Sequence, residues 1–141
     1  MKTYLLLILL FIASSCSCSK KDDHWGQVEM WKMAQKKDPS IELVFLQDTP
    51  EGRARRILCE NYRQEGCVLG SGKRIKVRLV EVLVLQYESA RYACLAAFEI
   101  SQWYARNWIF DDVTNEPVLM DFVKKVFDAK KPESLKDCES L

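Results

Sequence analysis

The pattern of polar and apolar positions is most regular between residues 74 and 87. Basic residues alternate with apolar ones over the first half, whereas apolar residues occupy both faces over the second half. Ile75, Val77 and Leu79 alternate with Arg74, Lys76 and Arg78, and then Val80, Val82 and Val84 stand opposite Leu83, Leu85 and Tyr87. We predict one central strand over residues 74–87, half solvated at its start and covered on both faces at its end.

Other segments have helical or strand-like patterns, separated by turn residues. Helices are predicted over residues 25–37, from the cap at Asp48 or Thr49 to Gly66, from Glu88 to Asn107, and from Thr114 to about Phe127. Shorter strands are predicted over 41–47, 67–69 and 108–113, with Gly70-Ser71-Gly72-Lys73 as a turn.

The order of these elements predicts the fold class. It is helix, then strand–helix–strand–strand–helix–strand, then helix. The central part, residues 41–113, resembles the ferredoxin-like split βαβ plait. We therefore expect one α+β domain over residues 25–131, a plait with extra N- and C-terminal helices, followed by a flexible tail over 132–141. Many unrelated functions share this plait, so the resemblance implies no catalytic residue.

The first nineteen residues have the pattern of an export signal. A basic start, Met1-Lys2-Thr3, precedes a ten-residue apolar core and then small residues. That core is shorter than the roughly 20 apolar residues that span a bilayer. The sequence Ala13-Ser14-Ser15-Cys16 resembles the lipobox of bacterial lipoproteins.

This resemblance implies that residues 1–15 are removed and that Cys16 is acylated. Residues 16–24 would then be a polar tether, and Ser17 after the cysteine implies an outer-membrane anchor facing the periplasm. Cleavage by an ordinary signal peptidase after Ser15, which would release a secreted protein, is the alternative.

Six cysteines occur in the chain. If Cys16 carries lipid, five remain, and an odd number cannot pair completely within one chain. Of the cysteines, Cys59 and Cys67 are the candidate pair for a disulfide, and two buried free thiols are the other interpretation that the sequence leaves open. Cys94 lies in an alanine-rich helix and is expected in the core.

Few residues suggest catalysis or metal binding. The only histidine, His24, lies in the tether, which removes the usual histidine-dependent catalytic and metal sites. The Gly70–Lys73 segment lacks the spacing of a phosphate loop, and Asp111-Asp112 lacks that of a calcium loop. We predict no catalytic residue, metal or cofactor.

Charge is balanced overall, with 21 basic and 20 acidic side chains, but it is unevenly distributed. Between Pro50 and Leu79 basic residues dominate. Six of these form a candidate binding surface: Arg53, Arg56, Lys73, Arg74, Lys76 and Arg78. A solvated face that discourages edge pairing is the alternative interpretation.

Four tryptophans, Trp25, Trp31, Trp103 and Trp108, fit either the core or a contact patch. The favoured function is a non-catalytic envelope lipoprotein that binds an acidic protein or polymer, not nucleic acid, and that could also form a homodimer. A plait that binds a small ligand or acts as an enzyme is the alternative.

Overall fold

The computed structural model describes residues 23–141. The elements are α1 (Gln27–Lys37), β1 (Glu42–Leu43), α2 (Pro50–Ala54), the 3-10 helix η1 (Cys59–Asn61), β2 (Lys73–Val77), β3 (Val80–Gln86), α3 (Ala90–Glu99), β4 (Trp103–Ala105), β5 (Trp108–Asp111), α4 (Pro117–Phe127) and α5 (Lys136–Glu139). The signal peptide, the lipidation site Cys16 and nearly all of the tether lie outside the described residues.

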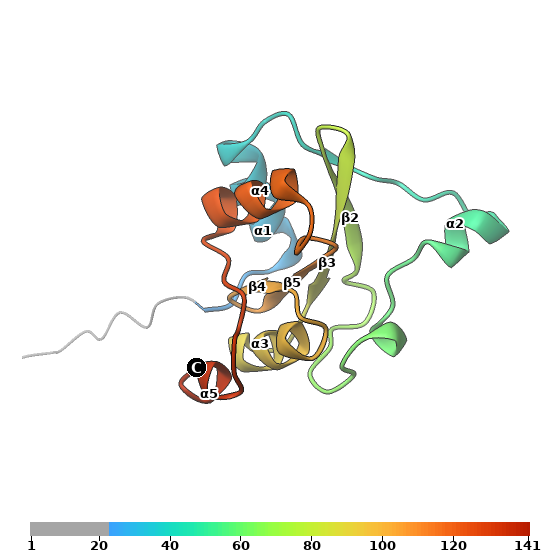
Figure 1. Ribbon diagram of the computed structural model, residues 1–141. Coiled ribbons are helices and arrows are strands. Elements are labelled where there is room, and N and C mark those ends of the chain that lie inside the picture. The colour runs from blue at the N-terminus through green and yellow to red at the C-terminus, as the bar shows by residue number, and fades with distance from the viewer. Residues whose placement is uncertain (1–22) are drawn as a thin grey trace, which may run out of the picture.

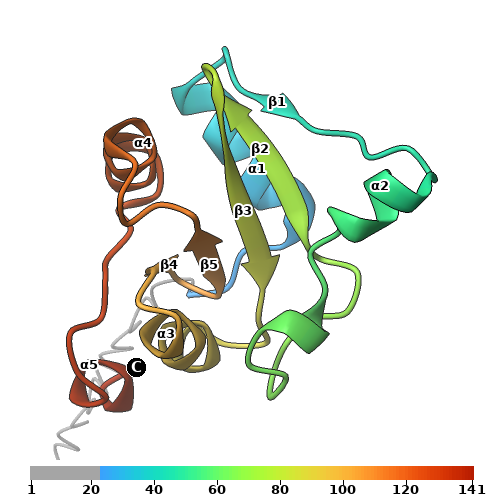
Figure 2. The same cartoon turned by 45° about the vertical axis from the view of Figure 1, so that its right-hand side comes forward.

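The five strands form one antiparallel sheet in the order β1-β2-β3-β5-β4. Helices α1 and α4 cover one face, and α3 with α5 lies on the other (Figure 1, Figure 2). The predicted α+β class is therefore confirmed. No described helix is long and apolar enough to cross a membrane.

The connectivity differs from the ferredoxin-like plait. The segment β3–α3–β4, with β5 between its two strands, forms one split βαβ unit. The plait needs a second, interleaved unit, but β1 and β2 are direct antiparallel neighbours and β1 lies at the edge of the sheet. The connection between these two strands contains only the five residues of α2 and one turn of η1, so no crossover helix packs there.

The single strand predicted over residues 74–87 is a hairpin. β2 and β3 pair through Val77 and Val80, and Arg78 and Leu79 form the turn. Arg78 has φ of 58°, a left-handed conformation that glycine or asparagine normally marks. The burial pattern is as predicted: Val82 and Val84 lie in the core under α1 and α4, whereas Leu83 and Leu85 pack on the α3 side.

The helix predicted from Glu88 to Asn107 ends at Glu99. Ser101 has φ of 55°, and the amides of Ser101 and Gln102 donate to the carbonyls of Phe98 and Ala97. These bonds form a Schellman C-cap in which serine takes the place that glycine usually has. The remaining residues form β4 and a tight turn into β5.

The helix predicted up to Gly66 ends at Ala54. Thr49 caps its start, since the Thr49 hydroxyl accepts a hydrogen bond from the Gly52 amide at 3.0 Å. A helix through Gly66 would hold Cys59 and Cys67 about 12 Å apart, at 1.5 Å per residue. Their Cα atoms are 5.9 Å apart and their sulfurs are bonded, so the chain cannot remain helical here.

Three smaller predictions also change. Of the strand expected over 41–47 only Glu42–Leu43 is formed, and of the strand over 67–69 only an isolated bridge between Cys67 and Tyr87 remains. Residues 132–141, expected as a flexible tail, contain α5. This helix is tied down because Cys138 is buried and bonded to Cys94 of α3.

The aromatic residues near the end of α3 belong to the core rather than to a contact patch. Trp108 is fully buried, and Trp25, Trp103 and Tyr104 are each less than a tenth exposed. Cys94, placed in the core from its alanine-rich surroundings, is fully buried but is half of a disulfide instead of a free thiol.

Candidate functional site

The six residues of the candidate binding surface come from the β1–β2 side of the sheet. Arg53 belongs to α2 and Arg56 follows it, Lys73, Arg74 and Lys76 belong to β2, and Arg78 forms the hairpin turn. Residues 44–58, which leave β1, pass through α2 and return, project from the body of the molecule (Figure 1, Figure 2). We call this segment the arm.

On the arm, two of the predicted cations share one carboxylate. Arg53 and Arg56 contact the same oxygen of Asp48, at 3.0 and 2.9 Å. All three side chains are largely exposed, so each ion pair contributes little to stability. Because two guanidinium groups face one carboxylate, this cluster keeps a net positive charge.

A second shared carboxylate joins the arm to the sheet. Arg55 donates two hydrogen bonds to Glu81, and Arg74 donates a third at 3.1 Å. The Arg74 Nε also donates to the Arg55 carbonyl at 2.8 Å. Although burial opposes ionisation, the hydrogen bonds from both arginines lower the pKa of Glu81. Arg55 and Glu81 were not among the residues singled out from the sequence.

The other three predicted cations make no ion pair with the described residues. The Lys73 ammonium donates only to the Gly70 carbonyl at 3.2 Å. Lys76 lies opposite Glu42 and Glu81 in the strand register but outside salt-bridge distance of either carboxylate. Arg78 lies at the hairpin tip, about 17 Å of extended chain from Lys73. The basic surface is thus a row of separate cations rather than one patch.

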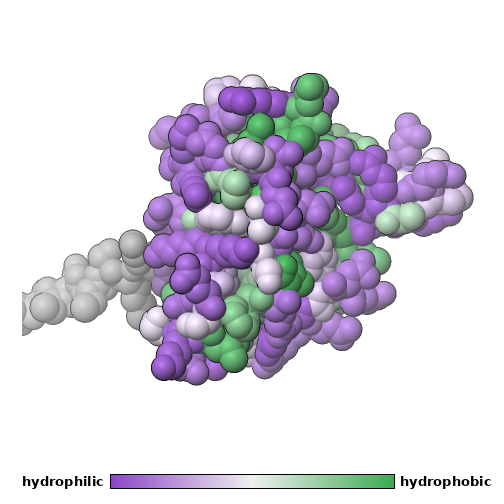
Figure 3. Space-filling model, viewed as in Figure 1, coloured by the Kyte–Doolittle hydropathy of each residue, from purple (hydrophilic) through white to green (hydrophobic). Residues whose placement is uncertain are grey.

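Exposed apolar side chains accompany these cations. Phe45 on the arm is 88% exposed, and Leu79 at the hairpin tip is 95% exposed. The face shown in Figure 3 is mainly hydrophilic, with a hydrophobic patch at the top, where the β2–β3 turn lies in Figure 1. Mixed apolar and basic surfaces of this kind are suited to contacts with another molecule.

Between the two halves of the arm lies a hollow of about 440 Å³. Residues 43–46 form one wall, 56–58 the other, and Gly70 with residues 72–74 the floor. The lining is apolar except for three cations, Arg56, Lys73 and Arg74, and contains no carboxylate. An occupant that combines apolar groups with negative charge would match this lining.

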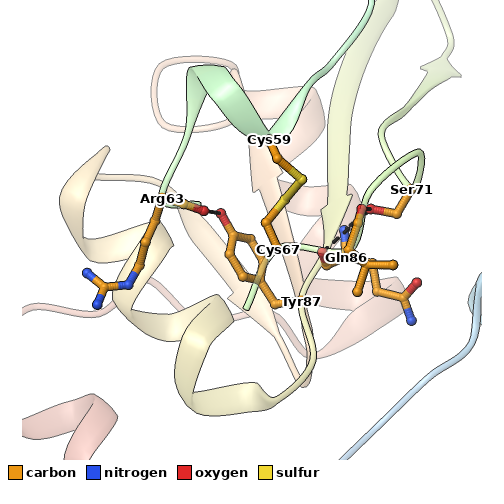
Figure 4. The surroundings of a disulfide bond; sticks show 7 residues. Cys59, Arg63, Cys67, Ser71, Gln86 and Tyr87 are labelled. Carbon is orange, nitrogen blue, oxygen red and sulfur yellow. Dashed lines mark hydrogen bonds between the residues drawn. A yellow bond between two sulfur atoms is a disulfide. The ribbon is translucent and has the colours of Figure 1, made fainter. Parts of the chain in front are cut away.

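The disulfide Cys59–Cys67 holds the base of the arm against the end of β3 (Figure 4). The Tyr87 hydroxyl donates to the Arg63 carbonyl at 2.8 Å, and the Ser71 hydroxyl accepts from the Gln86 amide at 3.0 Å. The Cys59–Cys67 disulfide is one of the two interpretations that the sequence left open for these cysteines. The turn predicted over Gly70–Lys73 is present at its start, since the Ser71 amide donates to the Val68 carbonyl at 3.2 Å and Gly70 has φ of 74°. The turn leads into β2 but is not a hairpin, because the strand expected over 67–69 is not formed.

Acidic residues at the end of β5 have structural partners. Asp111 accepts a hydrogen bond from the Tyr62 hydroxyl at 2.8 Å, and burial together with this bond raises the pKa of Tyr62. Burial and the neighbouring Asp111 raise the pKa of Asp112. Glu116 caps α4. Within residues 23–141 no three histidine, cysteine or acidic side chains lie close enough to hold a metal ion.

No protein-family model matches the chain, and no curated protein or solved structure proves similar to it.

Proposed function

We propose that the protein is an exported lipoprotein of the bacterial cell envelope and a non-catalytic module that binds an acidic protein or polymer. The export signal and the sequence Ala13-Ser14-Ser15-Cys16 support the location. The excess of arginine and lysine on the β1–β2 side supports an anionic partner.

The placement of the arm relative to the tether is the observation that carries the proposal. Asp23, where the described chain begins, lines a hollow together with Tyr104 and Arg106 of the β4–β5 hairpin. β4 is one edge of the sheet and β1 is the other, about 19 Å away at the usual strand spacing. In a chain anchored through Cys16, the tether would therefore join the domain near the edge of the sheet opposite the arm and its cations.

Charge reversal on the β1–β2 side tests the proposal directly. The variant Lys73→Glu/Lys76→Glu/Arg78→Glu changes the three cations that make no ion pair with the described residues. Because a glutamate at position 76 would face Glu42 and Glu81 across the strands, a thermal melt must first show that this variant is folded like the parent. We expect it to lose most of the capture of an acidic partner from envelope extracts at low salt, where the attraction is strongest.

A matched variant serves as the control. Lys130→Glu/Lys131→Glu/Lys136→Glu makes the same charge change with three exposed lysines of the C-terminal segment. Capture should persist in this control. If the first variant captures every partner as well as the parent does, the basic residues are a solvated face and the proposal is wrong.

The lipid anchor has its own test. The parent protein should fractionate with membranes and carry the mass of an acylated cysteine, whereas Cys16→Ala should be soluble after export. Unchanged fractionation and mass in that variant would contradict the anchor and favour the secreted alternative.

The hollow at the arm supports a second candidate function, the binding of a small ligand. Its volume is within the range of small-molecule sites. Native mass spectrometry of the purified chain would reveal a co-purifying metabolite, which would favour this candidate.

A further inference from the structure

β1 is one edge of the sheet, and the segment that follows it diverges from β2. β1 pairs with β2 through Glu42 and Leu43 only. The Val44 amide still donates to the Arg74 carbonyl at 3.0 Å, and beyond it the chain leaves the sheet. Edge strands in natural proteins are usually protected by lysine, proline or a covering element. Glu42 is the one charged residue of this edge, and residues 43–46, Leu-Val-Phe-Leu, contain neither a charge nor proline.

Backbone hydrogen-bonding groups are free on this segment. Among the described residues, the amides of Phe45 and Leu46 donate to no backbone or side-chain acceptor. An extended peptide can pair with such groups by adding a strand to the edge. Lipids and polysaccharides lack the regular backbone donors and acceptors for this pairing.

The hollow beside this edge is already formed. A Cβ on Gly72 would lie 2.2 Å from the Ile57 carbonyl oxygen, so the floor and one wall are in close contact. The bond from Arg74 to the Arg55 carbonyl and the ion pairs with Glu81 hold the returning half of the arm. A rigid, preformed site loses little entropy when a ligand binds.

The charges of the hollow indicate which peptide it would accept. Lys73 makes no ion pair within the described chain, and Arg56 shares Asp48 with Arg53. In an extended peptide whose apolar residues alternate with acidic ones, the apolar side chains would lie against Phe45 and Leu58. The carboxylates would then lie near Lys73 and Arg56.

We infer that the edge and hollow formed by residues 43–46, 56–58, 70 and 72–74 bind an extended, acidic segment of a partner protein by strand addition. This inference depends on the proposed function and specifies its partner as a polypeptide. Phe45 supplies the apolar contact, and Lys73 and Arg56 supply the positive charge.

The probe is an eight-residue peptide of alternating valine and glutamate, titrated by fluorescence anisotropy against the full-length chain. Two comparison peptides carry lysine in place of glutamate, or N-methylated amides on one edge. The acidic peptide should bind at least about tenfold more tightly than either comparison peptide. Phe45→Glu should weaken its binding by a similar factor.

Leu79→Glu is the matched control, because Leu79 is equally exposed but lies at the hairpin tip. The Leu79→Glu variant should bind the peptide like the parent.

Absence of binding below about 1 mM, or equal binding by the Phe45→Glu variant, overturns the inference. A dimer in sedimentation that Phe45→Glu abolishes would also overturn it and identify a second copy as the occupant. If capture from extracts still requires Lys73, Lys76 and Arg78, the proposed function survives this failure.

Discussion

The two ends of the sheet are held by different kinds of interactions. At the tether end, the Trp25 carbonyl accepts hydrogen bonds from Gln86, Asn107 and the indole of Trp108, and the Trp25 amide donates to Asn107 at 2.7 Å. Gln86, Asn107 and Trp108 are buried, as is Trp25 itself. The Arg106 guanidinium lies 4.0 Å from the centre of the Trp25 ring.

At the arm end, the contacts are mostly charged, exposed and local in sequence. Asp48 binds Arg53 and Arg56 within eight residues, and Thr49 caps α2. Buried hydrogen bonds resist water far better than exposed ion pairs do. Under the proposed function, the tether end joins the domain to its anchor, whereas the arm end keeps polar and apolar groups available for a partner.

The largest expected difference in stability is between an aspartate introduced in the core and one introduced on the arm. Val82→Asp buries a carboxylate between the sheet and α1 and α4, at a site with no exposure, and should cost at least about 4 kcal/mol, enough to abolish cooperative unfolding. Phe45→Asp should change stability by no more than about 0.5 kcal/mol. Thermal melts followed by circular dichroism compare the two, and a normal melt for Val82→Asp would contradict the burial of β3.

Removal of the Cys94–Cys138 disulfide should cost more stability than removal of the Cys59–Cys67 disulfide at the base of the arm. Cys94 and Cys138 close a separation of 44 residues, against 8 for Cys59 and Cys67. Loop-closure entropy then predicts a loss of about 4 kcal/mol for Cys94→Ala/Cys138→Ala and about 2.5 kcal/mol for Cys59→Ala/Cys67→Ala. Urea titration of each double variant measures the two losses, and the reverse order would show that α5 contributes little to holding the fold.

Removal of Asn107 tests the buried network at the tether end. In Asn107→Ala the amide of Trp25 and the carbonyl of Tyr87 lose their partners. The expected loss is about 2 kcal/mol, because each buried group pays for desolvation without a hydrogen bond. Asn115→Ala, at an exposed position before α4, should be neutral in the same urea titration. Equal stability of both variants would mean that Trp25 is held by apolar packing alone.

The smallest expected effect concerns Glu81 and depends on pH. Its pKa is lower in the folded chain than the ordinary value of 4.5. The stabilisation is therefore complete above that value and is lost as the pH falls through the lower, folded-state pKa. Glu81→Gln should cost no more than about 1 kcal/mol at neutral pH, with a difference from the parent that shrinks below about pH 4. A pH-independent difference would indicate lost packing rather than lost charge.

The sequence predicted the elements whose signals are local. The two-sided burial of Val82 and Leu83, the helix cap at Thr49 and the apolar face of α4 all follow from periodicity and capping residues. The turns at Arg78 and Arg106 were missed because neither position carries the glycine or asparagine that usually marks positive φ.

Features that depend on distant residues were beyond prediction from the sequence. Cys94 and Cys138 are 44 residues apart in the sequence and meet because α5 packs against α3. The basic residues of the candidate site could be identified, but their partners could not, since Glu81 reaches Arg55 and Arg74 only through the hairpin register.

The central claim is that the partner binds at the arm end and not at the tether end. Photo-cross-linking in intact cells tests it, with a photoreactive residue at Phe45 in one variant and at Lys130, beside Asp23, in the other. We expect an adduct with an acidic envelope protein from position 45 only, and we expect it to be lost when Lys73, Lys76 and Arg78 are reversed in charge. The same adduct from position 130, or none from position 45, would contradict it.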